Sequence, residues 1–154
     1  MREYGKVAPT FWTGETGRAL REMGRDEQLL ALFLMTGPTA NMIGIYDLPL
    51  AVVAHYLRWD AEGASKALRR ASEGGFCLYD TSVEQVWVPE MAAFQVGEPL
   101  KLTDNRLKFV HREWMSYRKS PFFMNFYRRY ALAYHLPDPS ELKPIQSPFE
   151  GPSK

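Results

Sequence analysis

The chain has 154 residues, of which 45% are apolar and 24% are charged, so it is long and apolar enough to fold as one packed domain and is not a disordered polypeptide. It has one cysteine, Cys77, and therefore no internal disulfide, and its first residues lack the apolar stretch of a secretory signal. We therefore expect a cytoplasmic protein. The longest apolar run, residues 29–35, is far shorter than the roughly 20 residues that span a bilayer, so we expect no membrane insertion.

The net charge of +1 indicates nothing by itself about nucleic-acid binding, but its distribution along the chain is uneven. Residues 37–100 carry four basic and eight acidic side chains, whereas residues 101–136 carry eight basic and two acidic ones. The middle of the chain is therefore acidic, and the segment that follows it is strongly basic.

The first 36 residues predict an aromatic anchor followed by helices. Phe11 and Trp12 form the anchor, and Thr13 or Thr16 is suited to cap a short helix that ends at Gly24. A second helix is predicted from Asp26 onward, because apolar residues then recur at helical spacing until Gly37 and Pro38 end the pattern. The side chains expected to face the core of this helix are Leu29, Leu32, Phe33 and Thr36.

A short strand is predicted next over residues 42–46, which are apolar and contain Gly44. Asp47 is suited to cap the following helix, with Pro49 in its first turn, where a missing N–H does no harm. That helix is expected to run to about residue 57, with Leu50, Val53, Ala54 and Leu57 toward the core.

Residues 61–75 show the clearest amphipathic pattern in the chain, with Asp60 as the expected cap and Gly74 and Gly75 as the end. One face is apolar and comprises Ala64, Ala67, Leu68 and Ala71. The opposite face is charged and comprises Lys66, Arg69, Arg70 and Glu73. Residues 76–79 and 85–88 follow as a predicted β-hairpin, because both runs are β-prone and a short polar segment connects them.

Two further helices are predicted after Pro89. The first carries Leu107, Val110 and Trp114 on one face and extends to about Lys119. The second is expected to start with Ser120 as its cap and Pro121 as its first residue. Its apolar face consists of five aromatic rings: Phe123, Phe126, Tyr127, Tyr130 and Tyr134. The proline-rich residues 137–154 are expected to form an extended tail.

Taken in chain order, these elements predict a mostly helical α+β protein. A helix, a lone strand, two helices and a hairpin occur in the order of a winged helix-turn-helix domain, to which additional C-terminal helices are appended. We therefore expect residues 1–100 to form a winged-helix domain, residues 101–136 to form helices packed on it, and residues 137–154 to form the tail.

Four stretches of the sequence resemble the winged-helix domains of phage and prophage replisome-organiser or replication-initiation proteins. They are PTFWTGETG, NMIGIYDLPL, EGGFCLYD and SPFFMNFYRRYALAYHLP, and the resemblance covers roughly residues 4–137. The shared motifs are structural and include no catalytic signature. The resemblance implies binding to double-stranded origin DNA and recruitment of replication proteins such as a helicase or its loader.

A DNA-binding face is expected on the helix of residues 61–75, because arginine can bridge guanine O6 and N7 and lysine neutralises phosphate. The candidate DNA-binding residues there are Ser65, Lys66, Arg69 and Arg70, and Lys108 and Arg112 of the basic segment join them if the fold brings the two helices together. The alternative is an ordinary solvent-exposed face on which Glu62 and Glu73 pair with the cations. The hairpin connection weakens the DNA hypothesis, because Asp80 and Glu84 would repel phosphates.

The aromatic face of the last helix leaves a second function open, that of a winged-helix module for protein interaction or dimerisation with little DNA affinity. The interaction surface would then consist of Phe123, Phe126, Tyr127 and Tyr130. Rings in such a number on one helix face are more often part of a core or a dimer surface than a platform for single-stranded DNA.

Catalysis is not expected from this sequence. His55, His111 and His135 lie on separate predicted helices without metal-ligand spacing, and Cys77 lies in an apolar strand that suits a buried thiol. No glycine-rich phosphate loop precedes a helix. We therefore expect a protein that is not an enzyme and that uses no metal and no cofactor.

Overall fold

The computed structural model describes residues 1–144 of the chain, and within them the protein is mostly helical with one small antiparallel sheet, which confirms the predicted α+β class. The elements, in chain order, are α1 (Thr10–Thr13), α2 (Glu15–Met23), α3 (Arg25–Thr36), β1 (Ile45–Asp47), α4 (Leu50–Leu57), α5 (Ala61–Glu73), β2 (Leu78–Asp80), β3 (Gln85–Trp87), α6 (Met91–Gln95), α7 (Arg106–Ser116), α8 (Phe123–Tyr130) and a 3-10 turn at Pro139–Glu141.

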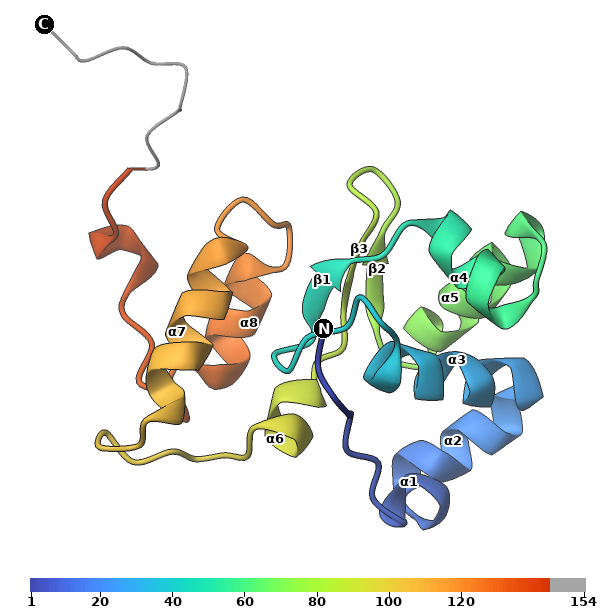
Figure 1. Ribbon diagram of the computed structural model, residues 1–154, viewed down its shortest axis with the longest axis horizontal. Coiled ribbons are helices and arrows are strands. Elements are labelled where there is room, and N and C mark those ends of the chain that lie inside the picture. The colour runs from blue at the N-terminus through green and yellow to red at the C-terminus, as the bar shows by residue number, and fades with distance from the viewer. Residues whose placement is uncertain (145–154) are drawn as a thin grey trace, which may run out of the picture.

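The three strands form a sheet in the order β1-β3-β2, so that the lone strand pairs with the far strand of the hairpin. Ile45 and Leu78 both pair with Trp87, and Tyr46 pairs with Val86. Because side chains alternate between the faces of a strand, Ile45 and Trp87 point to one side of the sheet and Tyr46 and Val86 to the other. Both faces are covered by helices, as Figure 1 shows.

The first face of the sheet packs against α3, α4 and α5. Tyr46 and Val86 belong to a buried cluster with Leu30, Leu34 and Val53, together with the alanine-rich face of α5. The predicted core face of α5 is confirmed, since Ala64, Ala67, Leu68 and Ala71 are all buried. The small alanine side chains allow the helix to lie close to the sheet. The predicted cap is confirmed as well, because the Asp60 side chain accepts a hydrogen bond of 2.6 Å from the Gly63 N–H.

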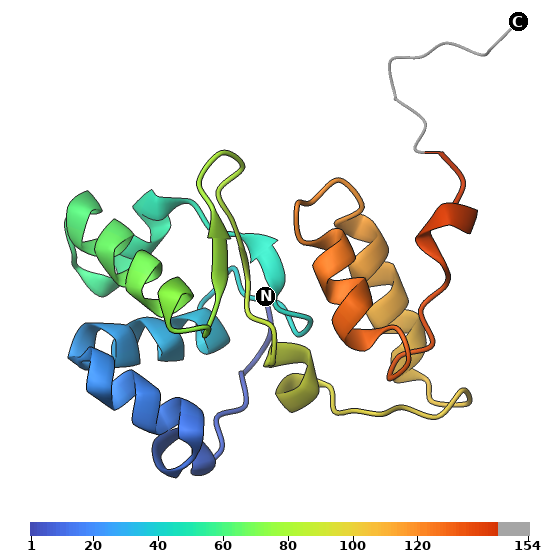
Figure 2. The same ribbon diagram turned by 180° about the vertical axis from the view of Figure 1, so that it is seen from behind.

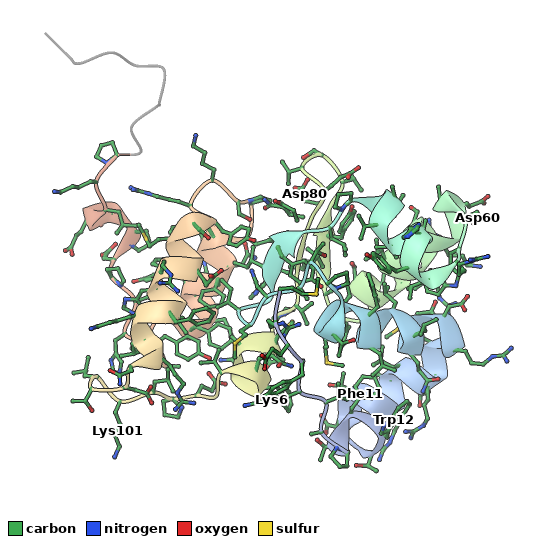
Figure 3. The ribbon with its side chains drawn as sticks, viewed as in Figure 1. Lys6, Phe11, Trp12, Asp60, Asp80 and Lys101 are labelled. Carbon is green, nitrogen blue, oxygen red and sulfur yellow. The ribbon has the colours of Figure 1, made fainter. Side chains whose placement is uncertain are left out.

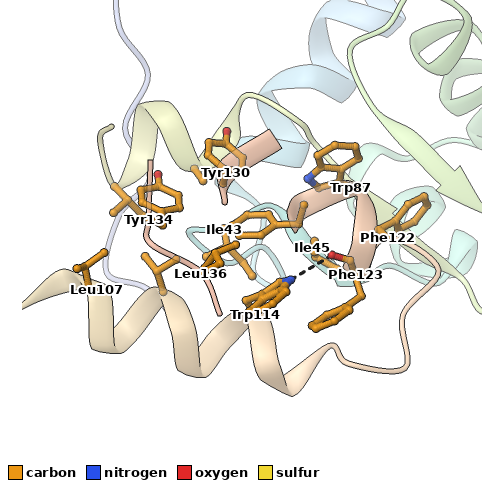
Figure 4. Close-up of a cluster of buried hydrophobic side chains, with 14 of the residues drawn as sticks. Ile43, Ile45, Trp87, Leu107, Trp114, Phe122, Phe123, Tyr130, Tyr134 and Leu136 are labelled. Carbon is orange, nitrogen blue, oxygen red and sulfur yellow. Dashed lines mark hydrogen bonds between the residues drawn. The ribbon is translucent and has the colours of Figure 1, made fainter. Parts of the chain in front are cut away.

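The second face of the sheet packs against α7 and α8 on the opposite side of the molecule (Figures 1 and 2). Here Ile45 and Trp87 meet a buried cluster rich in aromatic rings, part of which is drawn in Figure 4. The predicted core stripe of α7, Leu107, Val110 and Trp114, lies in this cluster and is buried. The sheet is therefore the middle layer between two separate helical layers.

Gly44 lies just before β1 and has a left-handed backbone with φ of 84°. A Cβ atom at this position would lie 2.7 Å from the Val88 carbonyl oxygen and 2.9 Å from the Met91 Cβ. A larger side chain would therefore separate the lone strand from the segment that follows the hairpin.

The core-facing side of α3 differs from the prediction. Leu29 is 44% exposed and Thr36 is exposed, whereas Glu27, Leu30, Ala31 and Leu34 are buried. Leucines and phenylalanine occur almost all around this helix, so two faces match the helical period equally well. On the buried face Leu30 and Leu34 pack in the core cluster and Glu27 pairs with Arg70, contacts that a periodicity count cannot detect.

Several predicted caps are also wrong, although the helices they were meant to start are present. Helix α4 begins after Pro49 with no capping side chain, so Asp47 does not cap it. Helix α8 begins at Phe123, after a turn in which the Ser120 hydroxyl accepts a hydrogen bond from the Phe122 N–H at 3.1 Å, so Pro121 is not its first residue. Gly14, with no capping side chain, precedes α2 instead of Thr13 or Thr16.

The two ends of the described chain both fold against the body of the protein. Phe11 and Trp12 lie within α1, with their ring centroids 4.9 Å apart in an edge-to-face arrangement. In the predicted tail, residues 139–141 form a 3-10 turn and Leu142 packs on the aromatic cluster, whereas residues 145–154 lie outside the described part of the chain. No helix in residues 1–144 is long and apolar enough to cross a membrane.

Candidate nucleic-acid interface

The outer face of α5 presents Ser65, Lys66 and Arg69 to solvent. Within residues 1–144 neither Lys66 nor Arg69 forms an ion pair, so the alternative in which Glu62 and Glu73 neutralise them is not observed. The two cations are separated by three positions on one helix and lie on the same side of it. This face therefore carries two positive charges that remain available for an external anion.

Arg70 does not belong to that face, which corrects its assignment as a DNA contact. Its Nη1 lies 3.0 Å from Glu27 Oε1, and its Nη2 donates a hydrogen bond of 2.5 Å to the Met23 carbonyl oxygen. The Glu27 carboxylate is buried, with 3% of its side chain exposed, and it requires a cation because an unpaired buried charge is costly. Arg70 consequently links α5 to α2 and α3, so its role is structural.

A groove of about 290 Å³ runs between α5 and the hairpin. Its walls are formed by Leu50, Ser65, Leu68, Arg69, Ser72, Tyr79 and Thr81. Ser65, Arg69 and Ser72 line it at positions i, i+4 and i+7 of α5, so one polar stripe of the helix faces the hairpin. The sequence reasoning missed Ser72, Tyr79 and Thr81; the i+7 spacing from Ser65 to Ser72 was a detectable signal, but the approach of the hairpin was not.

The tip of the hairpin is negatively charged. The Ser82 hydroxyl and backbone N–H donate to Asp80, and this hydrogen bonding lowers the pKa of that carboxyl. Asp80 is therefore ionised at neutral pH, with Glu84 nearby in the same connection. A phosphate backbone would meet favourable charge at α5 and unfavourable charge at the hairpin tip.

The basic residues of α7 lie away from α5. Figures 1 and 2 show α7 on the opposite side of the sheet from α5 in both views. Lys108 and Arg112, on α7, are exposed but do not join the α5 face, which corrects the expectation of one combined surface. In Figure 3, Lys101 and the α5 cap Asp60 likewise lie at opposite ends of the molecule.

The aromatic stripe of α8 is an internal core. Phe123, Phe126 and Tyr130 are buried against α7 and the sheet, and Tyr127 is partly buried beside them, so the assignment of these four residues as an interaction surface is wrong. Phe123 stacks on Trp114 with centroids 4.2 Å apart, and the Trp114 N–H donates to the Phe123 carbonyl oxygen at 3.1 Å (Figure 4). These rings hold α7 and α8 together.

Arg129 also has a structural role. Its guanidinium bridges Glu90 at 2.9 Å and Glu98 at 2.6 Å, and it lies over the Tyr130 ring with its Cζ 4.4 Å from the centroid. Hydrogen bonds to these two carboxylates, above all to Glu98, raise the pKa of the guanidinium. Arg129 thereby joins α8 to α6 and to the connection that follows it.

The histidines and the cysteine have structural environments. His111 and His135 each place Nε2 2.7 Å from a backbone carbonyl oxygen, those of Tyr134 and Leu100, and His55 is exposed with its ring edge-on to Tyr56. Burial raises the pKa of the Cys77 thiol to about 11, which keeps it protonated and unreactive at neutral pH. In the described part of the chain, no three His, Cys, Asp or Glu side chains cluster as a metal site.

Comparison of the chain with protein-family models, curated proteins and solved structures found no match.

Proposed function

We propose that the protein is a winged helix-turn-helix protein that binds double-stranded DNA through the exposed face of α5. The observation that carries this proposal is the pair of cations Lys66 and Arg69, which form no ion pair within residues 1–144, on an amphipathic helix beside a hairpin. The order of α3, β1, α4, α5 and the β2–β3 hairpin, with β1 paired to β3, is the arrangement in which the helix before the hairpin enters the major groove.

In this proposal α5 approaches the DNA with its outer face. Arg69 reaches base edges or phosphate, Lys66 neutralises a phosphate, and Ser65 and Ser72 donate hydrogen bonds along the same groove. Because Arg70 is held by Glu27, two cations remain where the sequence indicated three. The acidic hairpin tip repels phosphate and does not contact the duplex. Binding therefore depends on the two cations of α5 and is weak.

The resemblance to replisome-organiser and replication-initiation proteins supports a place in phage or prophage replication initiation or its control. We carry that role to this chain as part of the same proposal, together with replication proteins such as a helicase or loader as partners. The proposal assigns binding to the protein and no catalytic reaction.

The experiment that tests the assigned face compares two double charge reversals that change the net charge equally. We expect Lys66→Glu with Arg69→Glu to weaken duplex binding at least about tenfold, since both phosphate contacts become repulsive. Lys108→Glu with Arg112→Glu, on α7, is the matched control and should retain the affinity of the unmodified protein. Fluorescence anisotropy with a labelled random-sequence duplex measures both; equal loss in the two variants would show that only net charge matters and would reject the α5 face.

The alternative function is a protein-interaction module that docks through the aromatic face of α8. That face is buried inside the protein, so it does not offer a docking surface. A surface for a protein partner must therefore be sought elsewhere on the molecule.

A further inference from the structure

A second and larger groove lies at the other end of the domain from the hairpin tip, with a volume of about 850 Å³. Its walls come from the N-terminal arm, α1, α2, the segment after α5 and α6. The lining is largely apolar and comprises, among others, Val7, Phe11, Leu20, Phe76, Met91 and Phe94. Figure 3 shows the labelled Lys6, Phe11 and Trp12 on this side of the molecule, away from Asp80.

The wall formed by the N-terminal arm is held in place by Gln95. The Lys6 N–H donates to Gln95 Oε1 at 3.0 Å, and Gln95 Nε2 donates to the Lys6 carbonyl oxygen at 2.8 Å, so one buried amide side chain binds both backbone groups. Arg2 adds a hydrogen bond of 2.7 Å to the Met35 carbonyl oxygen. The groove is thus already formed in the free protein, which lowers the entropic cost of filling it.

Large apolar side chains stand exposed at the edge of this groove. Phe94 is 62% exposed and Trp12, next to the lining residue Phe11, is 48% exposed; Val7 is exposed as well. Water-exposed aromatic residues beside an apolar groove are typical of a surface that a partner covers. The floor is adaptable, because Met23, Met35 and Met91 line it and unbranched methionine side chains repack around different ligands.

The charges around the groove favour a basic occupant. Within the described residues 1–144, three ionisable side chains line it, and two of them, Glu15 and Glu90, are acidic, against one lysine, Lys6. Arg129 pairs with both Glu90 and Glu98, so these three groups together carry one net negative charge beside the groove. Glu90 also remains 61% exposed at its side chain, so its charge faces an incoming ligand.

From this geometry we infer that the groove binds an amphipathic helix of a partner protein whose polar face is basic. An apolar helix face supplies anchors at i, i+3, i+4 and i+7, which enter a groove of this kind, and basic side chains beside the anchors meet Glu15 and Glu90. The site is separate from the α5 face and does not depend on DNA binding.

Two synthetic helical peptides of about 18 residues test the inference, both with the same leucine stripe and with a polar face of either lysine or glutamate. We expect the lysine peptide to bind with a Kd below about 100 µM and at least tenfold more tightly than the glutamate peptide. Equal affinity of the two peptides, or no binding of the lysine peptide at that concentration, would overturn the inference.

Variants locate the binding site on the protein. Phe94→Asp should weaken binding of the lysine peptide at least about tenfold, and because Phe94 is mostly exposed the fold should tolerate the change. Leu132→Asp, at an exposed position outside the groove, is the matched control and should retain full binding. Glu15→Lys should reduce the preference for the lysine peptide, which no general loss of stability would do. Unchanged binding by both Phe94→Asp and Glu15→Lys would place the peptide elsewhere and reject the groove.

Discussion

Replacing Phe126 by alanine is expected to lower the free energy of unfolding by about 3–5 kcal/mol, the range for truncating a buried phenylalanine. Phe126 is fully buried at the centre of the cluster between the sheet, α7 and α8. Its ring centroid lies 4.7 Å from that of Tyr130 and 6.3 Å from that of Tyr134. Its removal leaves a cavity among large planar side chains that cannot collapse into it, and urea unfolding measures the loss.

Leu132→Ala is the matched control for this prediction. Leu132 lies two residues after the end of α8 and is 92% exposed, so its truncation should change the stability by less than about 0.5 kcal/mol. If Phe126 were instead a surface anchor of a dimer, Phe126→Ala would halve the mass measured by light scattering and leave the stability of the monomer nearly unchanged. That result would contradict the assignment of α8 to the core.

The second large effect is expected from Arg70→Ala, which should lower the free energy of unfolding by about 2–3 kcal/mol. Removing the guanidinium leaves the buried Glu27 carboxylate without its cation and frees the Met23 carbonyl oxygen, and breaking a buried ion pair costs about 3–5 kcal/mol. Because 40% of the Arg70 side chain is exposed, water reaches the site after truncation and the cost falls below that range.

Arg69→Ala, at the neighbouring position, is the control, and it should have the opposite effects on stability and on DNA affinity. Arg69 forms no ion pair in residues 1–144, so its truncation should leave the stability within about 0.5 kcal/mol while weakening DNA binding. Arg70→Ala should destabilise the fold and leave the DNA affinity of the folded protein unchanged. The two measurements, thermal unfolding and anisotropy, separate the roles; a loss of DNA affinity without a loss of stability in Arg70→Ala would return Arg70 to the binding face.

The elements that could be predicted from the sequence are those with one dominant local signal. Helix α5 has a single apolar face of small residues, a capping aspartate and two terminal glycines, and the structure agrees with the prediction on its buried face and its cap. Helix α7 has one apolar stripe, which is buried as predicted. In both helices the local pattern and the tertiary packing favour the same face.

Where two local patterns competed, the sequence did not decide between them. Helix α3 is apolar on two faces, and the buried face is the one on which Leu30 and Leu34 pack in the core and Glu27 pairs with Arg70, a residue 43 positions away. The same contact removed Arg70 from the candidate DNA-binding residues. Such a pairing leaves no periodic trace, because a charged residue in a helix is expected to face solvent, whereas Glu27 is buried against Arg70.

The aromatic residues of α8 were assigned to a surface for a related reason. Periodicity identifies one apolar face of a helix but not what covers it. Here that face is covered by the second side of the sheet, through Ile45 and Trp87, and by Trp114 of α7. The large apolar groove was missed altogether, because its walls come from segments between residues 6 and 95 that only the fold brings together.

The central claim, that α5 binds DNA through Lys66 and Arg69, is tested most directly by the salt dependence of binding. Fluorescence anisotropy of the unmodified protein is measured with labelled random-sequence duplex and single-stranded DNA between about 50 and 200 mM salt. Two phosphate contacts predict binding to duplex that weakens about tenfold over this range and exceeds binding to the single strand. No binding to duplex at the lowest salt, or affinity that does not change with salt, would contradict the proposed function.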